Sequence, residues 1–303
     1  MLRWRLLVAA IIIVPLVGIL VLDYRVNFGA PGIWLWPVVV AITALAVAEV
    51  LDLLRAKDWA PAAWSVYSGA LLVVGAGLVP LFWNLSGQAC PTTGTLGPLG
   101  WPLAAMAMSV PLVFLGEMVR YRQPGKSVVH VALAVFTIAY VGLLMTFLVA
   151  LRIYHGNGWG MAALVSLIFV TKMSDTGAYF VGRSLGRHKM TPILSPKKTI
   201  EGGIGGVLTA CLCSWLYFRW CVPWLVGDTA VATPWWGCVL YGVVVAVAGA
   251  CGDLSESLLK RDMERKDSSR WMPGLGGVLD VLDSLLVAAP AAYLCWAVGL
   301  VGP

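Results

Sequence analysis

Long apolar stretches separated by short polar segments make up most of this 303-residue chain. A membrane-spanning helix needs about 20 mostly apolar residues. Nine stretches meet that condition, at approximately residues 6–22, 33–51, 62–83, 99–119, 127–150, 159–182, 204–222, 235–257 and 278–300. Pro37 interrupts the second of them. The pattern predicts an all-α, polytopic membrane helical bundle of about nine transmembrane helices.

Composition agrees with this fold class. The chain is 60% apolar and 12% charged, whereas a soluble domain carries roughly 25% charged residues. The first stretch follows Arg3 and Arg5 and resembles a signal peptide, but its apolar run is long and no small-residue cleavage site follows. We therefore expect a retained helix. The seven cysteines show neither zinc-type spacing nor a disulfide framework.

The basic residues predict an orientation. With the N-terminus in the cytoplasm, 17 of the 21 Lys and Arg residues fall in inner segments, as the positive-inside rule requires. Acidic residues then gather at the same helix ends: Glu49, Glu117, Asp175, Asp253, Glu256, Asp280 and Asp283. We expect one polar site facing the cytoplasm. We divide the chain into N-terminal transmembrane helices (1–150, about five) and a C-terminal catalytic region (151–303) with basic loops at 183–203 and 258–277.

Two acidic pairs flank the second basic loop. Asp253 and Glu256 share a helix face with Lys260, and Asp280 and Asp283 share a face of the last helix. Acids at the edge of a membrane rarely lack a partner or a function. Oxygen ligands of this kind suit Mg²⁺ beside a bound polyphosphate. The alternative is simple ion pairing, of Glu256 with Lys260 and of either Asp pair with loop arginines.

The first basic loop lies in a segment from Lys172 to Gly206. Lys172, Asp175 and Tyr179 share a helix face, either as a substrate site or with Lys172 and Asp175 as an ion pair. The loop then combines six basic residues, His188 among them, with Ser195 and Thr199. The sequence EGGIGG opens the next helix, where backbone amides suit phosphate, although such glycines also serve helix packing. We expect Glu49 and Glu117 to be structural partners, and His130 to be inert.

These two segments resemble the phosphatidate cytidylyltransferase (CDP-diacylglycerol synthase) family. The family signature S-x-[apolar]-K-R-x4-K-D-x-[small]-x2-[apolar]-P-x-H-G-G-[apolar]-x-D-R-x-D is matched by Ser257, Leu259, Lys260, Arg261, Lys266, Asp267, Ser269, Pro273, Gly276, Gly277, Asp280 and Asp283. The upstream DTGAYFVGRSLGRHK and SPKKTIEGGIGG are also similar to the family. Leu275 stands at the family's His position and Val281 at its Arg position, and Met272 is a milder departure.

The resemblance implies transfer of a cytidylyl group from CTP to phosphatidic acid, with CDP-diacylglycerol and pyrophosphate as products. It implies a Mg²⁺ site and leaves open a monovalent co-ion such as K⁺. The implied catalytic residues are Asp253, Asp280, Lys260 and Arg261, and the metal ligands are Asp253, Asp280, Asp283 and Glu256. The implied substrate-binding residues are Asp175, Tyr179, Ser195, Lys197, Lys198, Thr199, Glu201, Gly202, Lys266, Asp267, Gly276 and Gly277.

The expected partners are CTP, phosphatidic acid and the lipid bilayer, without nucleic acid. The oligomeric state stays open, a homodimer included. The expected location is a bacterial cytoplasmic (inner) membrane, with the active site facing the cytoplasm. Two alternatives remain: a catalytically diverged relative that binds nucleotide or lipid, which Leu275 and Val281 keep open, and a cation-coupled transporter. The latter would distribute its acids through the membrane depth.

Overall fold

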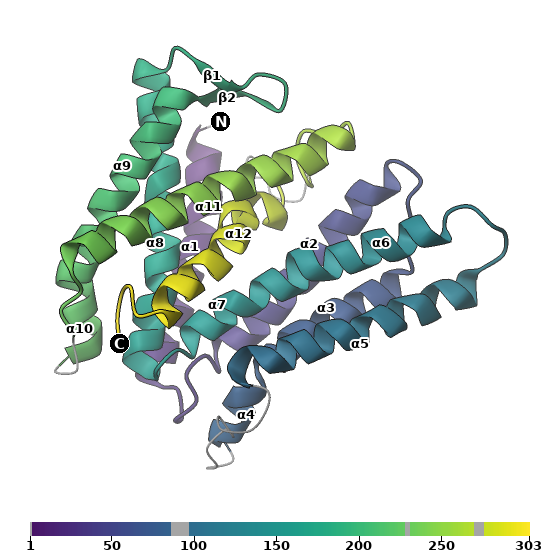
Figure 1. The fold of residues 1–303 in the computed structure, drawn as a ribbon, viewed down its shortest axis with the longest axis horizontal. Coiled ribbons are helices and arrows are strands. Elements are labelled where there is room, and N and C mark those ends of the chain that lie inside the picture. Colours follow the sequence, from purple (N-terminus) through teal and green to yellow (C-terminus); the bar gives the residue numbers. More distant parts are fainter. Residues whose placement is uncertain (1, 86–96, 228–230, 270–275) are drawn as a thin grey trace. The chain divides into compact units, whose positions relative to one another are not determined.

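The computed structural model describes residues 2–85, 97–227, 231–269 and 276–303, and these form two compact units. Unit 1 comprises residues 1–150 and 263–281, and unit 2 comprises residues 151–262 and 282–303. The fold is polytopic and almost entirely helical (Figure 1). Within the described residues, seven helical segments are long and apolar enough to cross a membrane: Leu35–Arg55, Leu99–Arg120, Ser127–Arg152, Asn157–Leu185, Ile200–Val226, Trp235–Asp262 and Val278–Ala297. The all-α membrane fold is thereby confirmed.

Unit 1 contains the first seven helices, which carry the labels α1 to α7. In chain order these are α1 (Leu2–Arg25), α2 (Leu35–Arg55), α3 (Ala63–Gly77), α4 (Val79–Leu85), α5 (Gly97–Arg120), α6 (Ser127–Thr137), the π-helical turn η1 (Ile138–Leu143) and α7 (Leu144–Arg152), whose last two residues belong to unit 2. The predicted stretch at 62–83 thus divides into α3 and α4. Pro37 does not interrupt α2, because it lies in the first turn, where its missing N–H costs no helical hydrogen bond.

Small residues let the helices of unit 1 approach closely. A Cβ on Gly69 of α3 would lie 2.5 Å from Cδ1 of Ile138 in η1, and one on Gly142 would lie 3.1 Å from Cα of Ala70. Close backbone contact at glycine and alanine is the usual way in which membrane helices pack. The core of the unit follows this contact, and Val66, Ala70, Val73, Ile138 and Val141 are fully buried.

Unit 2 contains α8 (Asn157–Leu185), α9 (Ile200–Leu216), the π-helical turn η2 (Tyr217–Cys221), α10 (Val222–Val226), α11 (Trp235–Asp262) and most of α12 (Val278–Ala297). Between α8 and α9 the chain forms an antiparallel hairpin of β1 (Lys189–Thr191) and β2 (Ser195–Thr199). The sequence pattern predicted only a basic loop there. The hairpin projects beyond the paired ends of α8 and α9 (Figure 1).

The glycines of the EGGIGG segment pack α9 against α8. A Cβ on Gly202 would lie 2.9 Å from the carbonyl oxygen of Ala178, and one on Gly205 would lie 2.5 Å from Cβ of Val181. No side chain larger than hydrogen fits at these positions. The sequence left two interpretations of these glycines, phosphate binding and helix packing. The structure therefore supports helix packing.

Candidate active site

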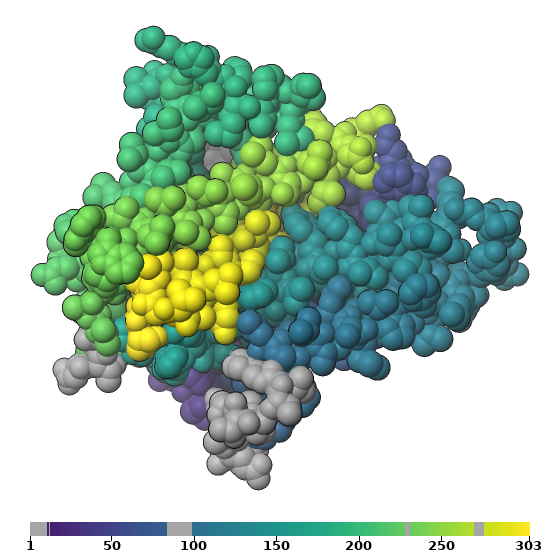
Figure 2. Space-filling model, viewed as in Figure 1, coloured from purple at the N-terminus to yellow at the C-terminus, as the bar shows by residue number. Residues whose placement is uncertain are grey.

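A close approach of α11 to α12 brings the acids of unit 2 together. A Cβ on Gly252 would lie 2.3 Å from the carbonyl oxygen of Asp283 and 3.1 Å from Cα of Ser284. Figure 2 shows the atoms of α11 in direct contact with those of α12. Only glycine permits this approach, so the Gly252-Asp253 dipeptide places the Asp253 carboxylate beside the start of the unit 2 part of α12.

Three carboxylates lie within electrostatic reach of one another there. Asp253 repels the charge of both Asp175 and Asp283, and the charge of Lys172 attracts both of those acids. Lys172 Nζ lies 3.6 Å from Asp175 Oδ2, so the ion pair of the alternative interpretation is present. The same lysine also donates to Ser284 Oγ at 3.3 Å. We refer to Asp175, Asp253 and Asp283 as the acid cluster.

Ser284 completes the link between α8 and α12. Its hydroxyl donates to Asp175 Oδ2 at 3.3 Å, and its backbone N–H donates to Asp283 Oδ1 at 2.5 Å. Asp283 is buried, whereas the side chain of Asp253 is 38% exposed. Asp253 and Asp175, whose side chain is 43% exposed, are thus more open to a ligand than Asp283.

The hairpin places one basic residue, Lys198, on the acid cluster. Lys198 Nζ lies 2.8 Å from Asp253 Oδ2, and Arg261 Nε donates to the carbonyl oxygen of Leu194 at 3.4 Å. These contacts connect the hairpin to α11 at two points. Lys197, the neighbour of Lys198 in β2, is exposed. The sequence predicted basic residues near these acids, and for Lys198 the structure shows the contact.

Glu256 and Lys260 form a buried ion pair one turn further along α11. Glu256 Oε2 and Lys260 Nζ are 2.5 Å apart, and their side chains are 1% and 12% exposed. This is the pairing that the structural alternative predicted. A buried carboxylate that lies against a lysine orients that lysine, and it would need rearrangement to bind a metal.

Asp280 belongs to a separate network in unit 1. Its Oδ2 accepts hydrogen bonds from the Ser268 N–H at 3.0 Å, the Ser268 hydroxyl at 2.7 Å and the Gly277 N–H at 2.7 Å. An acid in the first turn that bonds backbone amides stabilises the start of a helix. Asp280 therefore fixes the entry into α12.

Glu49 of α2 supports the same helix start. Its carboxylate accepts from the N–H groups of Val278 and Leu279, both at 2.8 Å, and from the Ser268 hydroxyl at 2.9 Å. Glu49 is buried. The prediction that it is a structural partner is confirmed, although its partners are backbone amides in the C-terminal part of the chain.

The carboxylates of Asp280 and Glu49 leave no room for a side chain at the two consecutive glycines of the signature. Gly276 has φ = +86°, which favours glycine, and a Cβ there would lie 2.3 Å from Asp280 Oδ2. A Cβ on Gly277 would lie 2.2 Å from Ser268 Oγ and 2.3 Å from Glu49 Oε2. The Gly-Gly turn thus lets two acids reach the first amides of α12.

Other predicted substrate-binding residues have local structural contacts. Thr199 is the N-cap of α9, and its Oγ1 accepts the Gly202 N–H at 3.1 Å. Glu201 accepts the N–H groups of Arg187 and His188, and His188 Nδ1 lies 2.5 Å from Glu201 Oε1. These bonds secure the hairpin to the start of α9.

The remaining predicted residues lie on exposed or half-buried surfaces. The Tyr179 hydroxyl accepts from Arg183 Nη1 at 2.9 Å, and its ring is 58% exposed. Ser195 lies at the start of β2 and is half-buried, whereas Lys266 and Asp267 are exposed residues of unit 1. Residues 270–275 of the signature segment, which include Arg270, Met272, Pro273 and Leu275, lie outside the described residues.

Three residues make contacts with predicted acids that the sequence did not indicate: Ser268, Ser284 and His130. Ser268 and Ser284 carry no charge and match no motif of their own, although each lies close to a predicted acid in the sequence or the fold. His130 was expected to be inert, but its Nδ1 lies 3.2 Å from Glu117 Oε2. No sequence signal joins these two residues, which lie on different helices.

Comparison with known proteins identifies a family. The model of the cytidylyltransferase family matches residues 4–298. A phosphatidate cytidylyltransferase of Mycobacterium bovis is 32% identical over 293 residues, which cover 94% of this chain and 87% of that protein. Proteins of the same name from Haemophilus influenzae (39% identity; 45% of this chain and 46% of that protein) and Bacillus subtilis (35% identity; 51% and 54%) match over shorter regions.

Proposed function

Because this chain belongs to the cytidylyltransferase family, we propose that it transfers a cytidylyl group from CTP to phosphatidic acid. The products are CDP-diacylglycerol and pyrophosphate. The observation that carries this proposal is the contact of Lys198 with Asp253, because it joins a basic hairpin to an acid cluster within a matched family region. Such a site can attract a triphosphate while keeping acidic oxygens beside it.

The reaction joins two anions. A P–O bond forms between an oxygen of the lipid phosphate and the α-phosphorus of CTP, and the bond from the α-phosphorus to the bridging oxygen of pyrophosphate breaks. A phosphate monoester is largely ionised near pH 7, so the nucleophile needs no general base. Positioning and charge neutralisation then account for most of the catalysis.

Basic side chains of unit 2 supply that neutralisation. Lys197 and Lys198 on β2, with Lys260 and Arg261 at the end of α11, would hold the triphosphate and the leaving pyrophosphate. Lys198 is already beside Asp253, and Glu256 orients Lys260. We retain Lys266, which belongs to unit 1, as a proposed substrate-binding residue.

The acid cluster fits a divalent cation. Its three carboxylates face two ammonium groups, those of Lys172 and Lys198, which leaves one net negative charge. Within the described part of the chain, no three His, Cys, Asp or Glu side chains already lie close enough to share a metal ion. A Mg²⁺ ion here would therefore take one or two of these carboxylates and complete its coordination with water and substrate phosphates.

We propose Asp253 and Asp283 as the Mg²⁺ ligands of unit 2, and retain Asp280 and Glu256 from the predicted set as further ligands or supports. When bound, Mg²⁺ would offset the negative charge of the phosphates. The hydrogen bonds to Asp280 Oδ2 and the Glu256–Lys260 pair favour supporting roles for those two acids. K⁺ as a co-ion and a homodimer stay proposals without a residue assigned to them.

We also propose that the site faces the cytoplasm from a bacterial inner membrane. CTP is water-soluble, and the basic segments that would receive it lie at helix ends. Phosphatidic acid carries its phosphate at the same interfacial depth. The two substrates can therefore meet without either crossing the hydrocarbon layer.

The test is Mg²⁺-dependent release of pyrophosphate by the purified protein in detergent, with CTP and phosphatidic acid, and with ATP as control. We expect CTP-selective release that requires both lipid and metal. Asp253→Asn should lower the rate by roughly 10²–10³-fold or more, with unchanged elution from a sizing column. Ion flux without pyrophosphate release would instead identify a transporter.

CTP binding without release would identify a diverged relative. In that case Leu275→His combined with Val281→Arg should restore release, because these changes return the family's residues to the signature. Activity of the unmodified protein would show that Leu275 and Val281 are compatible with catalysis.

A further inference from the structure

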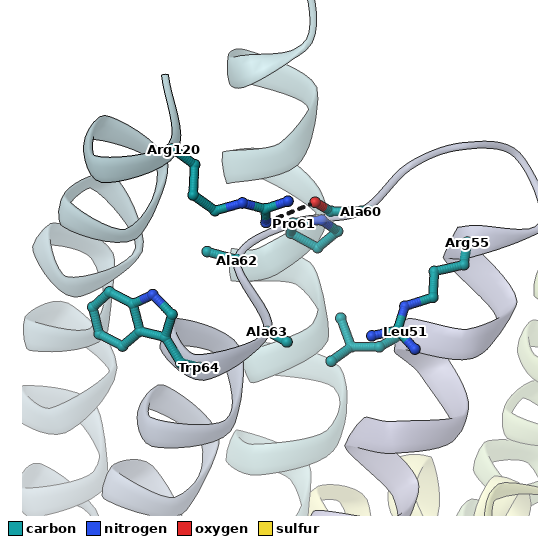
Figure 3. A pocket seen from close by; sticks show the side chains of 8 residues that line it. All are labelled: Leu51, Arg55, Ala60, Pro61, Ala62, Ala63, Trp64 and Arg120. Atoms are coloured by element: carbon teal, nitrogen blue, oxygen red, sulfur yellow. Dashed lines mark hydrogen bonds between the residues drawn. The ribbon is translucent and has the colours of Figure 1, made fainter. Parts of the chain in front are cut away.

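A cavity in unit 1 is lined by residues other than those of the acid cluster and the hairpin. It is partly open, with a volume of about 280 Å³. Figure 3 shows it between the end of α2, the connection into α3 and the end of α5. Its lining residues are Leu51, Arg55, Ala60, Pro61, Ala62, Ala63, Trp64 and Arg120. None of them has a role in the proposed cytidylyl transfer, so this inference does not depend on that function.

Two guanidinium groups line the cavity. Figure 3 shows those of Arg55 and Arg120 turned inward from different helices toward the segment 60–63. Arg55 is the last residue of the apolar span of α2, and Arg120 is the last of the span of α5. Both cations therefore lie where a hydrocarbon layer gives way to headgroups. Arginine at this depth is well suited to phosphate, which it can bind with two parallel hydrogen bonds.

The wall of the cavity is held in place before any ligand binds. The Ala62 N–H donates to Glu117 Oε1 at 2.8 Å, and Arg120 Nη1 donates to the carbonyl oxygen of Ala60 at 3.0 Å. A Cβ on Gly116 would lie 2.8 Å from Ser65 Oγ, so α5 packs tightly against the start of α3. A preformed wall lowers the entropic cost of binding.

The charge of the cavity matches a single negative charge. The lining residues include two arginines and no acid. Just outside them, the buried Glu117 lies 4.0 Å from Arg120 Nη1. Two positive charges and one negative charge leave a net charge of +1, which complements a phosphodiester.

The size of the cavity admits a lipid headgroup but not the acyl chains. A cavity of about 280 Å³ is too small for a whole two-chain phospholipid. The acyl chains would have to lie outside, and the ends of α3 and α5 offer apolar surface for them. Trp64, Leu115 and Met118 are 50%, 54% and 65% exposed.

We propose that this cavity binds the phosphodiester headgroup of an anionic membrane phospholipid. Arg55 and Arg120 bind the phosphate, and the acyl chains lie along the exposed apolar faces of α3 and α5.

Native mass spectrometry of the full chain tests the proposal, with dioleoyl phosphatidylglycerol added to the detergent-solubilised protein. We expect one retained lipid whose affinity falls roughly tenfold or more in the Arg55→Gln/Arg120→Gln double variant. Arg55→Lys/Arg120→Lys should lose less affinity, because the charge remains. Arg122→Gln is the matched control, since this exposed arginine lies two residues from Arg120 without lining the cavity, and it should bind like the unmodified protein.

Two further probes identify the source of the phosphate. Dioleoyl phosphatidylcholine, which is zwitterionic, should bind more weakly than phosphatidylglycerol, and millimolar inorganic phosphate should not displace the bound lipid. Equal binding of phosphatidylcholine, displacement by inorganic phosphate, or unchanged affinity in the folded double glutamine variant would each overturn the proposal. Preserved CTP-dependent pyrophosphate release, or a sizing profile like that of the unmodified protein, serves as the folding check.

Discussion

Lys198 of the hairpin and Asp253 of α11 form an ion pair with Nζ and Oδ2 separated by 2.8 Å. The lysine is thereby held beside an acid that is itself a proposed metal ligand. The Asp253 side chain is 38% exposed, so solvent screens the pair on that side and limits what it adds to stability, although Lys198 Nζ is buried. Its significance is positional, because it fixes a cation where a phosphate would bind.

Replacement of Lys198 by Met should therefore reduce catalysis more than stability. We expect kcat/KM for CTP to fall by roughly 10²-fold, as when one electrostatic contact to a transferring group is lost. The measurement is the initial rate of pyrophosphate release over a series of CTP concentrations. Lys189→Met, an exposed position on the other strand of the hairpin, is the control and should stay close to the unmodified rate. Equal losses in both variants would show that only general hairpin charge matters.

Gly252→Ala should disrupt the approach of α11 to α12. The new methyl group would meet the Asp283 carbonyl oxygen at 2.3 Å, and backbone cannot move aside as a flexible side chain can. We expect a loss of about 1–3 kcal/mol in the free energy of unfolding, together with lower activity because Asp253 moves. Thermal unfolding in detergent measures the first effect. Gly75→Ala, at a helical glycine with nothing within 4 Å of the added Cβ, should not destabilise the protein.

Glu49→Gln should weaken the start of α12. The carboxylate accepts two backbone amides and the Ser268 hydroxyl, whereas an amide side chain offers one acceptor oxygen and carries no charge. Loss of a buried, charge-assisted hydrogen bond costs about 1.5–3 kcal/mol. Activity should fall as well, because the same network holds Asp280. Asp52→Asn on the same helix breaks only an exposed pair with Arg265, and should lower the melting temperature far less.

Ser284→Ala tests the bridge between α8 and α12. The hydroxyl accepts from Lys172 and donates to Asp175, both at 3.3 Å. Each bond is long, so we expect a modest cost of about 1 kcal/mol in stability and a rate reduced only a few-fold. A complete loss of activity in a folded Ser284→Ala protein would mean that the hydroxyl contacts substrate directly.

Acid pH should release one surface ion pair, that of Lys57 with Glu264. The hydrogen bond and charge of Lys57 lower the pKa of Glu264 from its usual 4.5. Any stabilisation from the pair is therefore complete above pH 4.5 and is lost as the pH falls through the lower, folded-state pKa. At neutral pH, Glu264→Gln should leave the melting temperature nearly unchanged, because both side chains are exposed. A large neutral-pH effect would contradict this assignment.

Apolar periodicity predicted most of the fold because membrane helices are long and locally encoded. Each of the nine predicted stretches contains helix. The sequence also singled out both Asp253 and Lys198, which the structure brings into contact. The contact of Glu49 with Val278 was not predictable, since 229 residues separate the two. The hairpin was also missed, because SPKKT has neither alternating hydrophobicity nor strong β-formers.

The glycines were the hardest residues to interpret from the sequence. At Gly202, the pattern was consistent with phosphate binding and with packing, and only the position of Ala178 on the neighbouring helix distinguishes them. At Gly277, the limiting contacts come from Glu49 and Ser268. Steric limits of this kind arise from chain segments that are distant in sequence.

The crowded glycines bear on how a saturation mutagenesis screen of this protein would have to be interpreted. Gly252, Gly276 and Gly277 admit no Cβ without a collision with a carboxylate, a hydroxyl or a carbonyl group. In a growth selection, substitutions there would be depleted alongside substitutions of a proposed metal ligand. Cellular abundance, scored alongside growth, would separate the two classes: the glycine variants would be lost from the membrane fraction, whereas Asp253→Asn would persist as an inactive protein.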